Sequence, residues 1–326
     1  MIEIFAYLLV GSIGIVFAFK PTLVAVTSQF QCLWFIVYAI LVVIVRSEFD
    51  VDINTYARAM EDISFSLYYI REPVVWIGQS LFFRLVGSSY LVFLFYDLIA
   101  AMFLFSALVN LNVPKYSFFG ILLFFPFFLG MQNIYRQWFA SVLFLYCFSL
   151  AWDGDGNGKA KGVFFASALS HNVSFLFMPV LFLKFDWYRV SFRRYFLLLF
   201  PLVGIYLGRG TKSSASTGVE LEFWYLVVIV LLFLFVFLSD KCIIKKARRT
   251  EYELFIVLFF IALCAYFLLS STGAERVAMF CLIILYPLLA KILDERFSQK
   301  FLLRLLYLWC GFFPIFLFGL GNVFLY

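Results

Sequence analysis

Apolar runs of about 20 residues recur along the whole chain and are separated by short polar segments. The chain has no long stretch in which apolar and polar positions alternate, which is the pattern of a membrane β-barrel. Inside a bilayer each backbone N–H and C=O group needs a partner, so we expect these runs to be membrane helices. The sequence predicts an all-α, polytopic integral membrane protein with about nine to eleven transmembrane or re-entrant helices.

The predicted spans are residues 2–19, 29–45, 90–111, 117–129, 135–152, 163–184, 195–207, 222–238, 254–269, 277–290 and 301–325. No internal repeat is visible, so residues 1–326 are predicted to form a single helical membrane domain. The segment 73–86 carries Gln79 and Arg84 on an otherwise apolar run. We interpret it as an interfacial helix, with a broken span as the alternative.

The short apolar segment 117–129 contains Pro126, and glycines lie near its start and just after its end. Proline and glycine bend or interrupt membrane helices, often close to a functional site. We therefore expect a bent or interrupted helix here, immediately before the polar residues that open the next span.

The charged loops predict how the chain is oriented. The loop 46–72 has three arginines and six carboxylates, which favours the side away from the cytoplasm. The segment 241–249 has five basic residues, so the loop at about 240–253 is predicted to be cytoplasmic. The spans between these markers have the wrong parity, so either 163–184 or 195–207 must be re-entrant, split or interfacial.

The composition excludes several classes of protein. Hydrophobic residues make up 65% of the chain, and the mean hydropathy is +1.02, which is too apolar for a water-soluble domain of this size. The net charge of +6 is spread unevenly and therefore indicates topology, not nucleic-acid binding. The chain has six scattered cysteines, no CxxC pair and one histidine, so we expect neither a disulfide framework nor a metal site, and no cofactor.

Two arginines are predicted to lie at the outer ends of spans. Arg136 belongs to a polar segment that also contains Asn133 and Gln137, and Arg276 follows Glu275 just before the span 277–290. Two guanidinium groups, together with the N–H groups of helix starts, suit a diphosphate. The alternative is that each arginine extends to the membrane surface or pairs with a carboxylate such as Glu275.

His171 lies within an apolar run, next to Ser170, Asn172 and Ser174. A buried histidine most often completes a hydrogen bond, and this simpler role stays open. The functional alternative is that His171 accepts a proton or, when protonated, contacts a phosphate.

The acidic loop supplies a further group of candidates. Asp50, Asp52 and Tyr56 lie close together in the sequence, and Arg71 and Glu72 precede the segment 73–86. At a site of sugar transfer, a carboxylate can deprotonate an acceptor hydroxyl or bind sugar hydroxyls. The alternative is that these charged residues are only solvated.

Several short motifs follow one another in a recognisable order: Asp50-Val-Asp52-Ile-Asn54-Thr-Tyr56, Glu72-Pro73, Arg136-Gln-x-x-Ala140, Ala168-Leu-Ser-His171 and Glu275-Arg276. This order resembles the EpsG/Wzy family of bacterial O-antigen, capsule and exopolysaccharide polymerases, over about residues 45–290. The resemblance implies a metal-independent glycosyltransferase at the periplasmic face of the inner membrane. Such an enzyme joins oligosaccharide repeat units that are carried on undecaprenyl diphosphate.

The resemblance also implies roles for the candidate residues. Arg136 and Arg276 would hold the donor diphosphate, and His171 would act beside them as a base or a phosphate contact. Asp52 or Glu72 would orient or deprotonate the acceptor sugar. The remaining candidates for substrate binding are Asn133, Gln137, Asp50, Tyr56 and Arg71. The implied partners are the lipid-linked glycan donor and acceptor, membrane lipid and a chain-length regulator protein.

Two other functions stay open. A membrane O-acyltransferase that modifies glycans would also use an intramembrane histidine and arginine, but the single histidine here lies halfway along the chain instead of near its start. A transporter or flippase of lipid-linked oligosaccharide is disfavoured by the small length and the missing repeat symmetry.

Overall fold

The computed structural model describes residues 2–19, 27–46, 51–61, 67–153, 157–182, 199–206, 221–238, 249–296 and 300–318. These residues are almost entirely helical and include no strand, which confirms the predicted all-α class. The helices are α1 (Ile2–Phe19), α2 (Ser28–Val45), α3 (Val51–Glu61), α4 (Leu67–Ile70), α5 (Trp76–Val86), α6 (Ser89–Asn110), α7 (Lys115–Leu123), α8 (Phe125–Gln132), α9 (Tyr135–Asp153), α10 (Asn157–Ser170), the 3₁₀ helix η1 (Asn172–Phe182), α12 (Glu222–Leu238), α13 (Arg249–Leu268), α14 (Ser271–Arg296) and α15 (Lys300–Phe318). Residues 199–206 form a further helical stretch.

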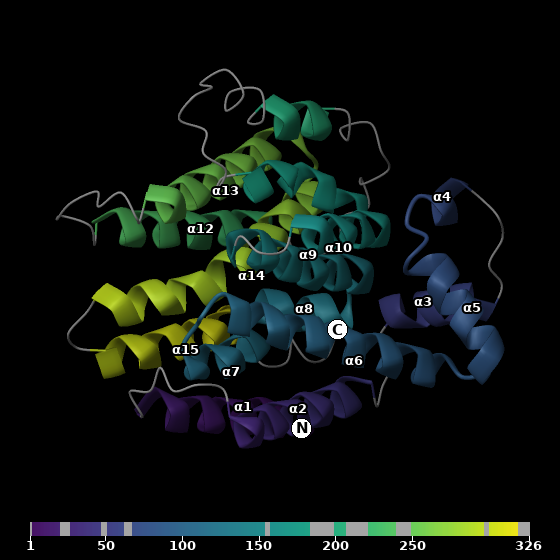
Figure 1. Cartoon of the computed structure of the whole chain (residues 1–326), viewed down its shortest axis with the longest axis horizontal. Helices are drawn as coiled ribbons and strands as arrows, with labels where there is room; N and C mark the ends of the chain where they lie inside the picture. The colour runs from purple at the N-terminus through teal and green to yellow at the C-terminus, as the bar shows by residue number, and fades with distance from the viewer. Residues whose placement is uncertain are drawn as a thin grey trace.

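The helix α14 lies at the centre of the bundle (Figure 1). Residues 277–290 are all buried, and α14 packs against α7, α8, α9, α12, α13 and α15. A helix that is apolar on every side is stable only when it is enclosed in this way. The helix begins at Ser271, so Glu275 and Arg276 lie in its first turns, whereas the sequence predicted that the span begins only after them, at residue 277.

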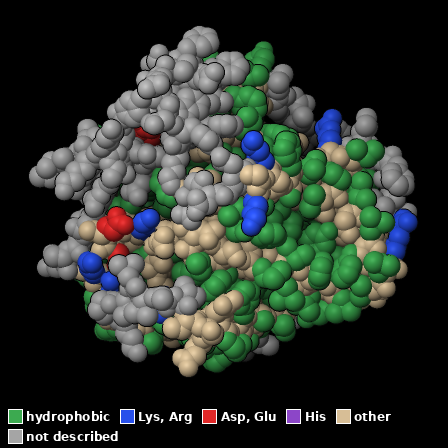
Figure 2. Space-filling view, viewed as in Figure 1, with side chains coloured by type: hydrophobic (Ala, Val, Ile, Leu, Met, Phe, Trp, Pro, Cys, Tyr) green, Lys and Arg blue, Asp and Glu red, His purple; other side chains and the backbone are tan. Residues whose placement is uncertain are grey.

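The outer helices expose apolar side chains. On α2, Ile36, Ile40 and Val43 are exposed at helical spacing, and hydrophobic side chains cover much of the described surface in Figure 2. An exposed apolar stripe of this kind is typical of a surface that faces lipid. The chain is a polytopic membrane protein.

Among the described helices, Ser28–Val45, Ser89–Asn110 and Ser271–Glu295 are long and apolar enough to cross a membrane. A fourth span results if α7 and α8 are counted together, and further apolar helices are shorter. The total of nine to eleven membrane helices stays a prediction.

The predicted interruption near Pro126 is confirmed. The helices α7 and α8 are bent by 52° at Phe124, and Pro126 lies in the first turn of α8, where its missing N–H removes no helical hydrogen bond. This bend directs α8 toward Asn133 and the start of α9.

The acidic segment 46–72 contains α3 and α4, and these helices form a group with α5 at one end of the bundle (Figure 1, right). The helix α5 has 11 residues. At 1.5 Å per residue it is about 16 Å long, roughly half the thickness of the hydrocarbon core. It ends at Gly87, whose φ of 71° glycine adopts without strain. The interfacial position of α5 stays a prediction.

The segment 163–184 is one of the two that were predicted to be irregular, and the structure splits it. The helix α10 ends at Ser170, and η1 begins at Asn172, so His171 lies between two helices of different types. A 3₁₀ helix as long as η1 is uncommon and often marks a functional position. The loop 208–218, most of the loop 240–253 and part of the segment 195–207 lie outside the described residues, and the orientation of the chain stays a prediction.

Candidate active site

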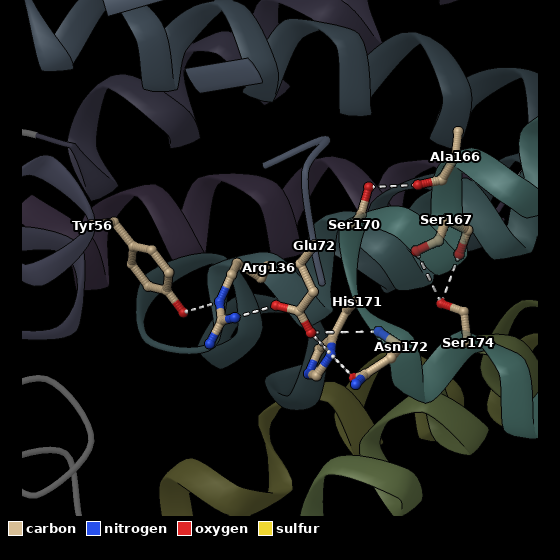
Figure 3. Close-up of polar contacts among 9 residues, drawn as sticks. All are labelled: Tyr56, Glu72, Arg136, Ala166, Ser167, Ser170, His171, Asn172 and Ser174. Atoms are coloured by element: carbon tan, nitrogen blue, oxygen red, sulfur yellow. Dashed lines mark hydrogen bonds and ion pairs between the residues drawn. The ribbon is translucent and has the colours of Figure 1, made fainter. Parts of the chain in front are cut away.

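Glu72 is the centre of a polar cluster that joins three segments of the chain (Figure 3). It lies in the turn between α4 and α5 and is 4% exposed. Its Oε2 pairs with Nη1 of Arg136, and its Oε1 is 2.7 Å from Nδ1 of His171. The backbone N–H of Asn172 also donates to Oε1, at 3.4 Å. We call Glu72, Arg136 and His171 the Glu72 centre.

The guanidinium group of Arg136, in the first turn of α9, lies against two aromatic rings. Its Nε donates to the hydroxyl oxygen of Tyr56 at 3.2 Å, and its Cζ lies 4.6 Å from the ring centroid of Trp76. The rings of Tyr56 and Trp76 are themselves 5.1 Å apart. Because Arg136 contacts a carboxylate, a hydroxyl and an aromatic face, its position is fixed before any ligand binds.

His171 lies at the break between α10 and η1, and this break brings its ring to Glu72. Its backbone N–H still donates to Ser167 O at 3.0 Å, as in a helix, whereas its carbonyl accepts from the N–H of Ser174, the 3₁₀ pattern. Val74 N–H donates to Leu169 O at 3.3 Å, which attaches the turn that carries Glu72 to the end of α10. These backbone hydrogen bonds therefore bring Glu72 and His171 close together.

The ring nitrogens of His171 have different surroundings. Nδ1 faces Glu72 and also lies 3.1 Å from Oδ1 of Asn172. Nε2 has no hydrogen-bond partner among the described residues. A carboxylate next to Nδ1 favours the tautomer that carries its proton there, which leaves the lone pair of Nε2 available.

Glu72 carries a charge at neutral pH. Burial raises its pKa, but the charge of His171 and its hydrogen bond, the charge of Arg136 and the Asn172 N–H together lower the pKa to about 2. A carboxylate with such a low pKa is a weak proton acceptor. Its geometry instead suits it to hold His171 and Arg136 in place.

The start of α9 is attached to the start of α14. The side-chain amide of Gln137 donates from Nε2 to the backbone carbonyl of Arg276. Arg276 is partly buried, and its Nε is a buried atom with no hydrogen-bond partner. The helix starts that carry the two predicted diphosphate ligands, Arg136 and Arg276, are thus neighbours, joined through Gln137.

Nearly the whole chain matches one protein-family model. A model of the EpsG family matches residues 31–326, nearly the whole chain. The chain belongs to the EpsG family. No curated protein and no solved structure matches it. Membership of the EpsG family supports a role of the polysaccharide-polymerase type.

The structure of this EpsG family member places the other predicted residues as follows. Arg71 is exposed next to Glu72, and Asn133 caps the end of α8 with a buried Oδ1 that has no partner. Asp50 and the side chain of Asp52 lie outside the described residues. In the part of the chain that is described, no three His, Cys, Asp or Glu side chains are grouped as metal ligands.

Two residues that support the site, Trp76 and Asp97, were not predicted from the sequence. Trp76 packs on Arg136 and lies one helical turn after Glu72, so an aromatic residue at that spacing was the available signal. Asp97 lies inside the predicted span 90–111, where a carboxylate is costly without a partner. Its partner is Arg46, at 2.9 Å between Nε and Oδ2, and the hydroxyl of Tyr135 donates to Oδ1 at 3.0 Å.

Proposed function

We propose that this protein is a polysaccharide polymerase of the bacterial inner membrane. It would transfer a glycan from one undecaprenyl diphosphate carrier to the lipid-linked repeat unit on another, at the extracytoplasmic face. The observation that carries this proposal is the buried Glu72 centre, in which a carboxylate, a guanidinium group and an imidazole from separate segments converge. Membership of the EpsG family supports the same reaction class.

His171 is the proposed proton acceptor. In glycosyl transfer the hydroxyl of the acceptor sugar attacks the anomeric carbon of the donor and loses its proton. Glu72 at 2.7 Å holds Nδ1 of His171, so the lone pair of Nε2 can take this proton. Glu72 remains ionised and stabilises the imidazolium that forms. We therefore assign orientation of the base to Glu72 and proton transfer to His171.

Arg136 and Arg276 are the proposed contacts of the donor diphosphate. As the glycosidic bond breaks, negative charge grows on the departing phosphate, and guanidinium groups and helix N-termini stabilise that charge. Glu72 offsets part of the charge of Arg136, so a second guanidinium group is needed, and Gln137 connects the start of α9 to Arg276. Asp50, Asp52 and Arg71 stay proposed contacts of the acceptor.

The test replaces residues of the Glu72 centre in a bacterium that makes the polymer, with surface glycan resolved by size. Arg136→Ala and His171→Ala are expected to remove long polymer while single repeat units still reach the surface. The loss for His171→Ala is expected to be about 10²–10⁴-fold. Tyr146→Phe, a change on α9 outside the Glu72 centre, is the control and should leave the polymer unchanged.

The other outcomes separate the alternative functions. A flippase predicts that both variants lose surface sugar altogether. An O-acyltransferase predicts polymer of full length that lacks only its acyl groups. Polymer of unchanged length and composition in both variants would refute the assignment of the site.

A further inference from the structure

A second polar cluster lies where the first turns of α12 and α14 meet. These helices pack against each other in the bundle (Figure 1). Glu222 and Tyr225 lie three residues apart on α12 and therefore share one face. Glu275 and Arg276 lie in the first turns of α14. Gln137, next to Arg136, is attached to this cluster through its hydrogen bond to the Arg276 carbonyl.

Several polar atoms of this cluster are buried and have no hydrogen-bond partner in the described structure. They are Oε2 of Glu222, the hydroxyl of Tyr225, Nε of Arg276 and Oε1 of Gln137. Tyr225 is only 3% exposed and Gln137 is 0% exposed, so water does not reach these two side chains freely. A buried polar atom without a partner is destabilising, so a group of them indicates a site for a polar ligand.

The carboxyl groups of the cluster also indicate a polar ligand. Glu275 is 5% exposed and lies near enough to Glu222 for the two charges to repel. Tyr225 lies within electrostatic range of Glu275. Among the described residues neither carboxylate forms an ion pair. Glu275 is buried and Oε2 of Glu222 is a buried atom without a partner, so both carboxyl groups suit hydrogen-bond donors from a ligand.

The unpartnered atoms define the chemistry of that ligand. Glu222 and Gln137 offer acceptor oxygens, Arg276 offers a donor, and the Tyr225 hydroxyl can act as either. A ligand that both donates and accepts at neighbouring atoms matches this set. The adjacent hydroxyl groups of a sugar do so, whereas a phosphate, which only accepts, would leave the acceptor oxygens of Glu222 and Gln137 without a donor.

We propose that Gln137, Glu222, Tyr225, Glu275 and Arg276 form a binding site for the hydroxyl groups of a sugar of the lipid-linked glycan. The inference rests on the proposed polymerase function. It identifies the sugar, not the diphosphate, as the part of the substrate that these residues bind. Gln137 adjoins Arg136 in sequence, so the bound sugar would lie beside the Glu72 centre.

Glycan binding to the purified full chain in detergent tests this inference. The probe is the oligosaccharide released by mild acid from the lipid-linked pool of cells that express the protein, and tryptophan fluorescence reports binding. Glu222→Gln and Glu275→Gln are each expected to weaken oligosaccharide binding by about tenfold or more, because each change replaces an acceptor oxygen of the carboxyl group with an amide NH₂. Binding of undecaprenyl diphosphate without sugar should stay unchanged.

Tyr225→Phe is a matched variant that should not destabilise the fold. It removes only a buried hydroxyl without a partner, so the free protein should be as stable as the wild type or more stable, measured as Tm. Oligosaccharide affinity should nevertheless fall severalfold. If all three variants bind the oligosaccharide as the wild type does, or if calcium or sodium binds at Glu222 and Glu275 in its place, the sugar site is refuted.

The outcome for the sugar site is separate from that for the proposed function. His171→Ala should bind the oligosaccharide normally even though it makes no polymer. Polymer formation by His171→Ala would refute the catalytic assignment, whatever the oligosaccharide affinities are. Unchanged affinity in the α12 and α14 variants would refute only the sugar site.

Discussion

The Arg46–Asp97 and Arg136–Glu72 ion pairs have the same chemistry and different settings. Arg46 and Asp97 have side chains that are 1% and 0% exposed, and Asp97 also accepts from Tyr135. Arg136 and Glu72 have side chains that are 15% and 6% exposed, and Glu72 also contacts His171. The first pair is enclosed between helices α2, α6 and α9, whereas the second joins the turn before α5 to the first turn of α9.

The difference indicates what each pair does. The Arg46–Asp97 pair is stacked on the rings of Phe93 and Tyr135, where no substrate can reach it. It fixes Tyr135, the residue before Arg136, and thereby the start of α9. The Glu72 centre has a titratable imidazole with an unpartnered nitrogen and a partly exposed guanidinium group. We therefore expect loss of stability from changes in the first pair and loss of activity from changes in the second.

The largest effect is expected for Asp97→Ala. It leaves the guanidinium group of Arg46 buried without a counter-charge, a change that destabilises proteins by about 3–5 kcal/mol. Folded yield and Tm in detergent should fall sharply. Replacing both partners, as Arg46→Met with Asp97→Leu, should restore most of the stability, because no uncompensated charge remains. If the double variant is no more stable than Asp97→Ala, the charge explanation is wrong.

Glu72→Gln should mainly affect the reaction. The amide can still form a hydrogen bond, but it no longer fixes the tautomer of His171 or stabilises the imidazolium, so the polymerisation rate should fall roughly a hundredfold or more. The rate is measured with purified protein and lipid-linked repeat units. Binding of the donor lipid should change far less than the rate. A normal rate in this variant would show that Glu72 has no part in proton transfer.

Tyr56→Phe tests the support of Arg136. The change removes the hydroxyl that accepts from Arg136 Nε and keeps the ring beside Trp76. A hydrogen bond to a charged group contributes about 1.5–3 kcal/mol. Because Tyr56 only supports Arg136, the affinity for the donor lipid should fall by about tenfold. Tyr146→Phe on α9 is the control that should bind the donor normally. Equal affinities in the two variants would contradict the role of Tyr56.

The smallest expected effect is on how stability depends on pH. The pKa of Glu72 is lowered to about 2 from 4.5, so its ion pairs contribute stability that is fully present above pH 4.5 and is lost as the pH falls toward 2. The difference in Tm between the wild type and Glu72→Gln should therefore be larger at pH 5 than at pH 3. A difference that grows on acidification would contradict this sign.

The sequence predicted much of the fold because apolar runs in a membrane leave the helix as the favoured element. The span predicted at 135–152 corresponds to α9, and the interruption at Pro126 is present. The 3₁₀ form of η1 was not predictable, since residues 172–182 are as apolar as an α-helical span. A break at His171 depends on tertiary contacts such as Val74 with Leu169.

The candidate site was predicted as single residues, not as contacts. Glu72, Arg136 and His171 were each selected, yet Glu72 and His171 are about 100 positions apart in the chain, and periodicity carries no information on such a pairing. Arg46 was predicted to be the first residue of the acidic loop 46–72, because nothing in its local sequence indicates Asp97 as its partner. The sequence thus identified polar residues that are costly in a membrane, and the packing of α9 on α6 and α10 decided their partners.

The most direct test of the central claim is polymerisation by the purified protein in liposomes. The only substrate is the undecaprenyl-diphosphate-linked repeat unit, and a chelator is present. We predict that the wild type forms a ladder of repeat multiples and releases undecaprenyl diphosphate, while His171→Ala binds the same donor and forms no ladder. A ladder of equal length and rate from His171→Ala would contradict the claim that the Glu72 centre carries out glycan transfer.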